Sequence, residues 1–592
     1  MIVLLTLIII QLISKVVQKR KFGISLNLIE IFVFSLYGWI FFTSIIKGIS
    51  IGETFRQIIV LIPFGLLLIL IRRISYHYDE YYLKRLLIKG IFIVGIYQSV
   101  FGVLQYFFDK DNLGIYKTLV TGSIIYPNSY GIFMVISLSC LIVLLRETTN
   151  LKYKIFLWSA CILFLFVIFI NLSRGAILSG AISACIIYYV WLQKKSKKKL
   201  SKIGQWGIVV FLFTIFSCLF LFFYHLNEDS SRGRMFIMKI IYPMFNEHLF
   251  IGIGYNQFKY SFLNYQELFF QNENNLIWAH KAIDNGSVNN QFLKCFLELG
   301  LVGGCIFSIL WLIIIRCTYV HYNFKYGYWF FFVILTLFFH CFLDETFQSL
   351  VIIFIFLYVI ALIPNKLFVF RVNSLKWPVV LLISLLGMSL VQNILKMYLS
   401  SFSYKYECLA ANALSNAQYD LAFYNCNEAL SIDSTSLTCK TILGRTLIGK
   451  STLEQTLMKN KYLQEGIKYL ENVKCQYHDR DLYLALSYGY LKTNDYQNAL
   501  YYAQKVHKMF PVQARPKLLL GILYYGQNNK AQSKVYLEDC VKACERNNRK
   551  NSLQINMMAN SLLRKLNDSV PLPLLMDDLK FALSIDSIMI AH

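Results

Sequence analysis

Arg174 stands between two long apolar runs, in the stretch FINLSRGAILSG, with almost no polar loop around it. A charged side chain near a membrane costs about 3 kcal/mol unless it faces water or a partner, so such a charge is a candidate functional group. A cation whose long stem reaches the membrane interface explains the position equally well. The other polar residues that share a side of the membrane with Arg174 therefore bear on its role.

A second basic stretch, SSRGRMFIMKIIYPMFNEHLFIGIGYNQF, begins with Arg232 and Arg234, continues as an amphipathic helix and ends in the glycine turn GIG. Solvated surface arginines are common, so neither residue is informative alone. Guanidinium groups bind phosphate oxygens in a bidentate way and keep their charge. Two or three arginines on one outer face therefore predict a site for a phosphorylated anionic ligand, including one carried on a lipid.

Amides, carboxylates and a histidine complete the candidate set. Asn128, in YPNSYG, precedes a helix, where an asparagine is most often a cap. The remaining candidates fall in WAHKAIDNGSVNNQFLKCFLELGLVGG, before and at the start of a later apolar run; they are His280, Asp284, Asn289, Asn290 and Glu298.

Composition indicates a membrane protein. Of 592 residues 57% are hydrophobic, and the mean hydropathy is +0.51. Lys and Arg exceed Asp and Glu by 58 to 33, as is common in cytoplasmic loops, and no nucleic-acid partner is expected. The 14 cysteines show no metal-site spacing, so zinc and redox chemistry have little support.

Apolar runs long enough to cross a bilayer predict a membrane domain over residues 1–399 with about twelve helices. They start near Ile2, Leu26, Arg56, Leu86, Ser129, Lys154, Gly175, Gln205, Glu298, Gly327, Ser349 and Pro378. The first run has neither a preceding basic region nor a cleavage site, which favours a span over a removable signal peptide. The odd-numbered connections are richer in Lys and Arg, so we expect them in the cytoplasm. The long connection 225–297, both termini and all the candidate residues then lie outside.

Residues 400–592 change to amphipathic helix pairs with a period near 34 residues, which is typical of a helical repeat. Tyr483, Leu486, Tyr490, Ala499 and Pro511 stand at spacings that resemble the tetratricopeptide repeat. An unrelated helical bundle is the alternative. The predicted fold class is thus all-α, a polytopic membrane bundle followed by an α-solenoid on the periplasmic side.

Several stretches between about Ile91 and Ile314 resemble the O-antigen ligase and polymerase superfamily. They are NLSRGAILSG, RGRMFIMKIIYPMFNEHLFIGIGYNQF and NNQFLKCFLELGLVGG, supported by GVLQYF and YPNSYG. The resemblance implies an enzyme of the bacterial inner membrane that takes a glycan from an undecaprenyl diphosphate carrier on the periplasmic side, without metal or cofactor. It further implies that Arg174 and Arg234 hold the leaving diphosphate, with Arg232 as a spare.

The family's histidine is missing. Where the family pattern reads His-Asn-x-x-Leu, this chain has Asn289 and Asn290 followed by Gln291, and Asn289 cannot act as a base. His280, nine residues upstream and near Asp284, is the candidate replacement, with a surface histidine as the alternative. Asp284, Glu298 and the pair His340 and Asp344 are weaker candidates. Asn128, Arg232, Asn289, Asn290 and Glu298 are expected to bind substrate.

The sequence therefore predicts a glycan ligase, whose acceptor is lipid A core or protein, or a polymerase, whose acceptor is another glycan. Protein O-oligosaccharyl transfer is favoured by the repeats, whose concave surface suits a protein partner or another large acceptor. A lipid-linked glycan flippase is disfavoured because the predicted spans carry few charges near their middles. A repeat scaffold with a membrane anchor is disfavoured because twelve spans exceed what an anchor needs.

Overall fold

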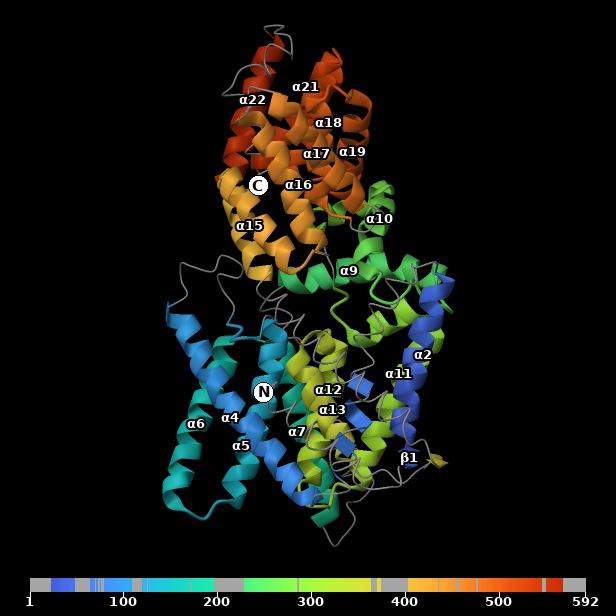
Figure 1. Ribbon diagram of the computed structural model, residues 1–592, viewed down its shortest axis with the longest axis vertical. Coiled ribbons are helices and arrows are strands. Elements are labelled where there is room, and N and C mark those ends of the chain that lie inside the picture. Colours follow the sequence, from blue (N-terminus) through green and yellow to red (C-terminus); the bar gives the residue numbers. More distant parts are fainter. Residues whose placement is uncertain are drawn as a thin grey trace. The chain divides into compact units, whose positions relative to one another are not determined.

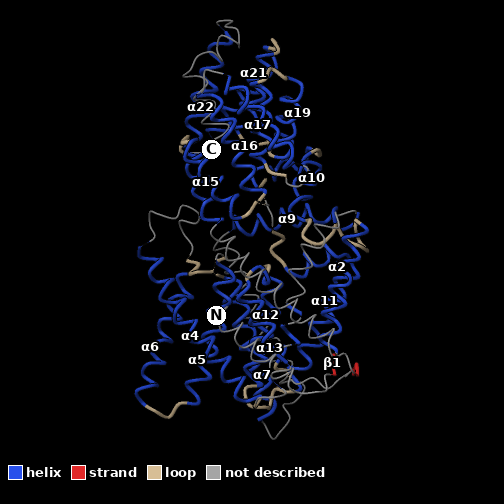
Figure 2. Tube along the Cα trace, viewed as in Figure 1, coloured by secondary structure: helices blue, strands red, loops and turns tan. Residues whose placement is uncertain are grey.

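The computed structural model describes residues 23–47, 79–108, 120–195, 228–284, 287–363, 370–373 and 403–567, with short internal gaps, and scattered residues between 64 and 75. These residues form two compact units. The first comprises residues 1–237, 244–258 and 287–393, and the second comprises 238–243, 259–286 and 394–592. Helices account for nearly all of the regular structure (Figure 2).

In the described part of the first unit, eight labelled helices are mostly apolar and are drawn from blue to yellow-green in Figure 1. Their bounds are α2 Leu28–Ile46, α4 Glu80–Phe108, α5 Pro127–Glu147, α6 Leu151–Asn171, α7 Arg174–Lys195, α11 Gln291–Val320, α12 Gly327–Leu343 and α13 Leu350–Ala361. Two short strands, β1 Gly23–Leu26 and β2 Phe370–Asn373, pair antiparallel. The described part of the chain is therefore mainly, but not wholly, α-helical.

Among the residues that the structure describes, six helices are long and apolar enough to cross a membrane: α2, α4, α5, α6, α7 and α11. Helices α12 and α13 are apolar but shorter. The prediction of a polytopic membrane protein is confirmed at this level. The predicted spans that start near Ile2, Arg56, Gln205 and Pro378 lie wholly or largely outside the described residues, so the count of twelve stays a prediction.

Helix α5 forms the centre of the first unit. It packs against α4, α6, α7 and α12, and 72% of its apolar window is buried. Small side chains let neighbours approach, and Trp329 of α12 donates a hydrogen bond to the Ser139 hydroxyl at 2.9 Å. Helix α5 is therefore held firmly against α4, α6, α7 and α12.

Two glycines lock the turn after helix α9 (Glu228–Glu247) onto helix α11. Gly252 and Gly300 both have positive φ angles, of 80° and 69°. A Cβ on Gly252 would lie 2.4 Å from the Glu298 carbonyl oxygen, and one on Gly300 would lie 2.2 Å from that of Phe250. Only glycine combines this backbone conformation with such close approach. The segments GIG and ELG, far apart in sequence, thus form one structural joint.

The second unit includes part of α9, the helices α10 Phe258–Phe270 and η1 Glu273–Lys281, and the C-terminal helices. Residues 403–415 form a helix without a label. The labelled C-terminal helices are α15 Tyr419–Ile432, α16 Leu437–Leu453, α17 Leu457–Lys474, α18 Arg480–Lys492, α19 Tyr496–Met509, α20 Ala514–Gly526, α21 Lys530–Glu545 and α22 Lys550–Asn567.

Helices α18 to α21 form two equivalent hairpins whose first helices start 34 residues apart. Asn494 and Asn528 take the same left-handed conformation in the two turns. A hydrogen bond joins the two helices of each hairpin at equivalent positions, 34 residues apart. The Ser487 hydroxyl donates to the Ala499 carbonyl in the first hairpin, and the Ser533 hydroxyl donates to the Gly521 carbonyl in the second. The 34-residue period is therefore present in the structure, while membership of the tetratricopeptide family stays a prediction.

Candidate functional site

Two predicted arginines come together in the first unit. Arg174 is the first residue of α7 and is half-buried. Arg234 lies in α9, is exposed, and interacts unfavourably with the charge of Arg174. The positive end of the α7 dipole adds to this potential, because backbone N–H groups at a helix start lack intrahelical partners. An anion bound here would relieve the repulsion, and helix starts are ready-made anion sites.

Asn128 stands beside this pair at the start of α5. The residue at the cap position is Tyr126, which makes no side-chain capping bond, so Asn128 is not the helix cap that its position suggested. Its side chain accepts a hydrogen bond from the Ser173 hydroxyl at 3.2 Å and donates one to the Asp344 carboxylate. Asn128 therefore links the residue before Arg174 to the segment that follows α12.

The end of α12 brings a carboxylate to the arginines. Arg234 donates a hydrogen bond to the Leu343 carbonyl at 3.1 Å, and its charge attracts the next residue, Asp344. Burial raises the pKa of Asp344 above its usual range, although the Asn128 hydrogen bond and the Arg234 charge oppose the shift. A carboxylate with a raised pKa beside an anion site is a candidate for proton transfer.

His340 lies one turn before the end of α12 and is fully buried. Its Nδ1 is 2.9 Å from the Thr346 hydroxyl, whereas its Nε2 has no hydrogen-bond partner among the described residues. A Cβ at Gly175, the residue after Arg174, would lie 3.8 Å from this Nε2. An orphaned buried nitrogen needs an explanation, and a ligand group bound at the start of α7 would supply one.

The segment before α11 is fixed to the same side of α12. Asn290 caps α11 through the Leu293 N–H at 2.9 Å and donates to the Phe342 carbonyl at 3.0 Å. Asn289 has a φ angle of 56°, a left-handed conformation that asparagine tolerates well. Glu345 accepts hydrogen bonds from the Ser287 hydroxyl and from Lys294 at 2.8 and 2.7 Å. Asn290 therefore contacts the residue next to Leu343, whose carbonyl binds Arg234.

Comparison with known proteins gives the same assignment as these motifs. Residues 159–308 match the family model described as O-antigen ligase, and this segment includes Arg174, Arg232 and Arg234. Residues 159–308 belong to the O-antigen ligase family. No curated protein matches the chain. The family match indicates glycosyl transfer of the ligase or polymerase type, and with it a lipid-linked glycan donor in general terms.

Glu298 lies in the O-antigen ligase segment, but its contacts indicate a structural role. Its side chain is 2% exposed and accepts hydrogen bonds from the N–H groups of Asn256 and Phe258, at the start of α10. Its backbone carbonyl accepts from the Gly254 N–H at 2.9 Å. The structure thus places Glu298 at the joint between α11 and the glycine turn, where it orders the loop.

The other predicted residues of the O-antigen ligase segment lie elsewhere. Arg232 is exposed on α9, two residues before Arg234. His280 is exposed near the end of η1, and Asp284 follows it; both belong to the second unit, where the Asp284 carboxylate is 3.6 Å from Arg480. The contacts described above therefore join Arg174, Arg234, Asn128 and Asn290 to α12, and they do not include His280 or Asp284.

The sequence offered Asp344 and His340 only as weaker base candidates. Both come more than 100 residues after Arg234 and outside the matched segment. The available signal was positional, because they stand at the end of an apolar helix whose outer end was expected on the side of the arginines.

Proposed function

We propose that the protein transfers a glycan from an undecaprenyl diphosphate carrier to an acceptor on the periplasmic face of the bacterial inner membrane. The observation that carries this proposal is the juxtaposition of Arg174 and Arg234 at the start of α7, where their charges repel each other. A diphosphate matches this geometry because it accepts bidentate hydrogen bonds from both guanidinium groups.

In the proposed reaction an acceptor hydroxyl oxygen attacks the anomeric carbon of the donor. The bond from that carbon to the diphosphate oxygen breaks, and the electron pair leaves with the diphosphate. Arg174 and Arg234 stabilise the charge that develops on this leaving group, an electrostatic role that needs no proton transfer. His340 Nε2 is placed to make one further hydrogen bond to it.

The acceptor proton needs a base, and Asp344 is the candidate favoured by its contacts. It lies beside Arg234 and is oriented by Asn128, and its pKa is raised. His280 and Asp284, predicted from the sequence, remain the rival candidates on the long loop. Lipid A core, a second carrier-linked glycan and a protein are the alternative acceptors, and the C-terminal repeats favour a large one.

The direct test is transfer by the purified full-length protein in lipid nanodiscs, with a synthetic undecaprenyl diphosphate oligosaccharide as donor. Replacing Arg174 or Arg234 by alanine should lower the transfer rate about 100-fold to 1,000-fold. Arg146→Ala is the matched control, since this exposed arginine at the other end of α5 contacts the Tyr328 ring instead. Equal activity of all three variants would remove the proposed role of the arginine pair.

The acceptor and the topology need separate experiments. In a deletion strain, loss of long chains from lipid A core would indicate a ligase, and single-unit glycans would indicate a polymerase. Unmodified periplasmic proteins would indicate protein glycosylation. Reporter fusions after Ser400 should be active outside the cytoplasm, and cytoplasmic activity would overturn the predicted span count.

A further inference from the structure

Part of the O-antigen ligase segment folds with the C-terminal repeats. Residues 259–286 lie within the matched range 159–308, yet they form one compact unit with residues 394–592. They comprise nearly all of α10, the helix η1 and the residues up to Gly286. The repeats are therefore not an appendage joined only through the chain after α13, because their unit contains a loop of the transferase domain.

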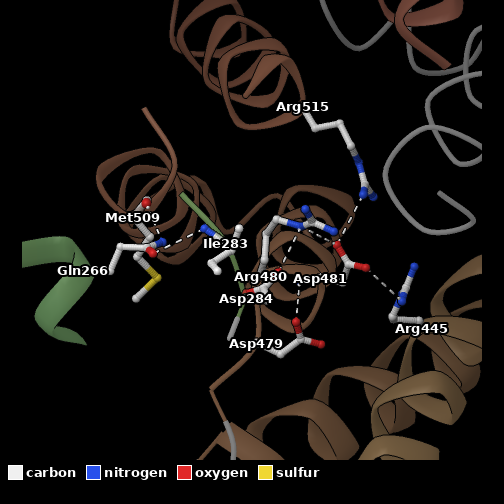
Figure 3. A network of polar contacts seen from close by, with 9 residues as sticks. All are labelled: Gln266, Ile283, Asp284, Arg445, Asp479, Arg480, Asp481, Met509 and Arg515. Atoms are coloured by element: carbon white, nitrogen blue, oxygen red, sulfur yellow. Dashed lines mark hydrogen bonds and ion pairs between the residues drawn. The ribbon is translucent and has the colours of Figure 1, made fainter. Parts of the chain in front are cut away.

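Gln266 of α10 is the first anchor of this loop (Figure 3). Its side chain is fully buried. The amide donates a hydrogen bond to the Met509 carbonyl at 2.9 Å and accepts one from the Ile283 N–H at 3.4 Å. Met509 ends α19, where carbonyl groups lack intrahelical partners. One buried amide thus joins α10, the chain after η1 and the end of a repeat helix.

Arg480 at the start of α18 is the second anchor. Its guanidinium is 3.6 Å from the Asp284 carboxylate, and its backbone N–H donates to the same group. It is also 3.0 Å from Asp481, which contacts Arg445 of α16 and Arg515 of α20 at 3.4 and 3.3 Å (Figure 3). The loop is therefore tied to a charge network that spans three successive helix pairs.

The segment between the two anchors carries His280. Trp278 of η1 stacks beneath the Lys239 ammonium of α9 at 5.3 Å from the ring centroid, a cation–π contact that orients the helix. Asn272 caps η1 through the Asn274 N–H. His280 itself is exposed, so an ordered backbone presents it to the surroundings.

We propose that the C-terminal repeats position the loop that carries His280 and Asp284, with Gln266 and Arg480 as the positioning residues. This inference rests on the proposed function, in which His280 and Asp284 are the rival candidates for the base that acts on the acceptor, and the anchoring itself rests on the contacts of Gln266 and Arg480. The repeats set how residues 273–284 are presented, so they act on acceptor use more than on donor binding.

The test compares Gln266→Leu and Arg480→Ala with Lys534→Ala in the full-length protein. Lys534 is the control because it pairs with Glu538 in an exposed contact of the same unit. Amide hydrogen exchange of residues 273–284 should accelerate about tenfold in the first two variants and stay unchanged in the control. Gln266→Leu leaves the Met509 carbonyl and the Ile283 N–H without their partner, and Arg480→Ala removes the ion pair with Asp284. In the two anchor variants the KM for the acceptor should rise while the KM for the donor stays unchanged. Arg480→Lys should have an acceptor KM between those of the wild type and Arg480→Ala.

Unchanged exchange in both anchor variants would overturn the proposed anchoring, as would equal increases in the two KM values. If Gln266→Leu does not fold, the Arg480 series decides alone. The exchange result is independent of catalysis. Absence of transfer by the wild-type protein would therefore defeat the proposed function and leave the anchoring to be judged by exchange.

Discussion

The two units use arginine in opposite ways. In the first unit, Arg174 and Arg234 repel each other, and Asp344 is the carboxylate that Arg234 attracts. In the second unit, three arginines stand among three aspartates in one network: Arg445, Arg480, Arg515, Asp284, Asp479 and Asp481. A charge-balanced cluster holds helices together, whereas repelling cations at a helix start suit an anionic ligand. Repulsion between Arg174 and Arg234 in the first unit thus contrasts with attraction between arginine and aspartate in the second.

The largest effect on the transfer rate is expected from a substitution of Asp344 in the first unit. Asp344→Asn removes the proposed base but keeps the side-chain shape, so the transfer rate should fall about 100-fold or more while the thermal transition of the protein hardly moves. The pH–rate profile of the residual activity should also lose its acidic limb. Asp539→Asn, at an exposed position of α21, is the matched control. Wild-type activity of Asp344→Asn would return the base assignment to His280 or Asp284.

The opposite outcome is expected at Asp481. Although burial raises its pKa, three neighbouring guanidinium groups hold the pKa of Asp481 well below its usual range. Asp481→Asn leaves those cations without their shared anion, which should cost about 3 kcal/mol. For a unit of this size the melting temperature should fall by about 5 to 10 °C. Differential scanning calorimetry of the purified protein measures the melting temperature. A fall no larger than that of Asp539→Asn would contradict a structural role for the cluster.

A smaller effect distinguishes charge from shape at the ligand site. Arg174→Lys keeps the cation but loses the planar two-point contact with a phosphate. We expect about a tenfold lower transfer rate and an unchanged melting temperature. Arg445→Lys in the second unit is the counterpart, and it should lower the melting temperature without this loss of rate. If Arg174→Lys lost as much as Arg174→Ala, positive charge alone would not explain the site.

Hydropathy predicted the helices of the first unit well where apolar runs are clean. Predicted starts near Ser129, Lys154 and Gly175 compare with helices that begin at Pro127, Leu151 and Arg174. The start near Glu298 was several residues late, because α11 begins at Gln291 and its first two turns include the polar Gln291 and the charged Lys294. Apolar content marks where a helix enters hydrocarbon, and it does not mark a polar extension of the same helix.

The candidate site was predictable only as far as motifs reach. Arg174 and Arg234 stand in recognisable stretches, so the sequence could name them. The contact of α7 with α12 brings His340 beside Gly175, and no spacing rule encodes that contact. The anchoring of the long loop by Gln266 could not be predicted either, because Gln266 binds backbone groups of Met509 and Ile283. Backbone partners carry no signature in residue type.

The smallest effect is expected in the pH dependence of stability, and it tests the charge balance of the arginine–aspartate cluster in the second unit. Burial, followed by repulsion from Asp479, raises the pKa of Asp284 to about 7, and Arg480 opposes this shift. The folded state therefore binds this proton more tightly than the unfolded state, so the contribution of Asp284 to stability is lost as the pH rises from about 4 to about 7. Asp284→Asn should raise the melting temperature at pH 8 by a few degrees, raise it less at pH 5 and leave it nearly unchanged below about pH 4. A lower melting temperature of this variant at pH 8 would mean that attraction to Arg480 outweighs burial, and that the cluster is held by charge pairing throughout.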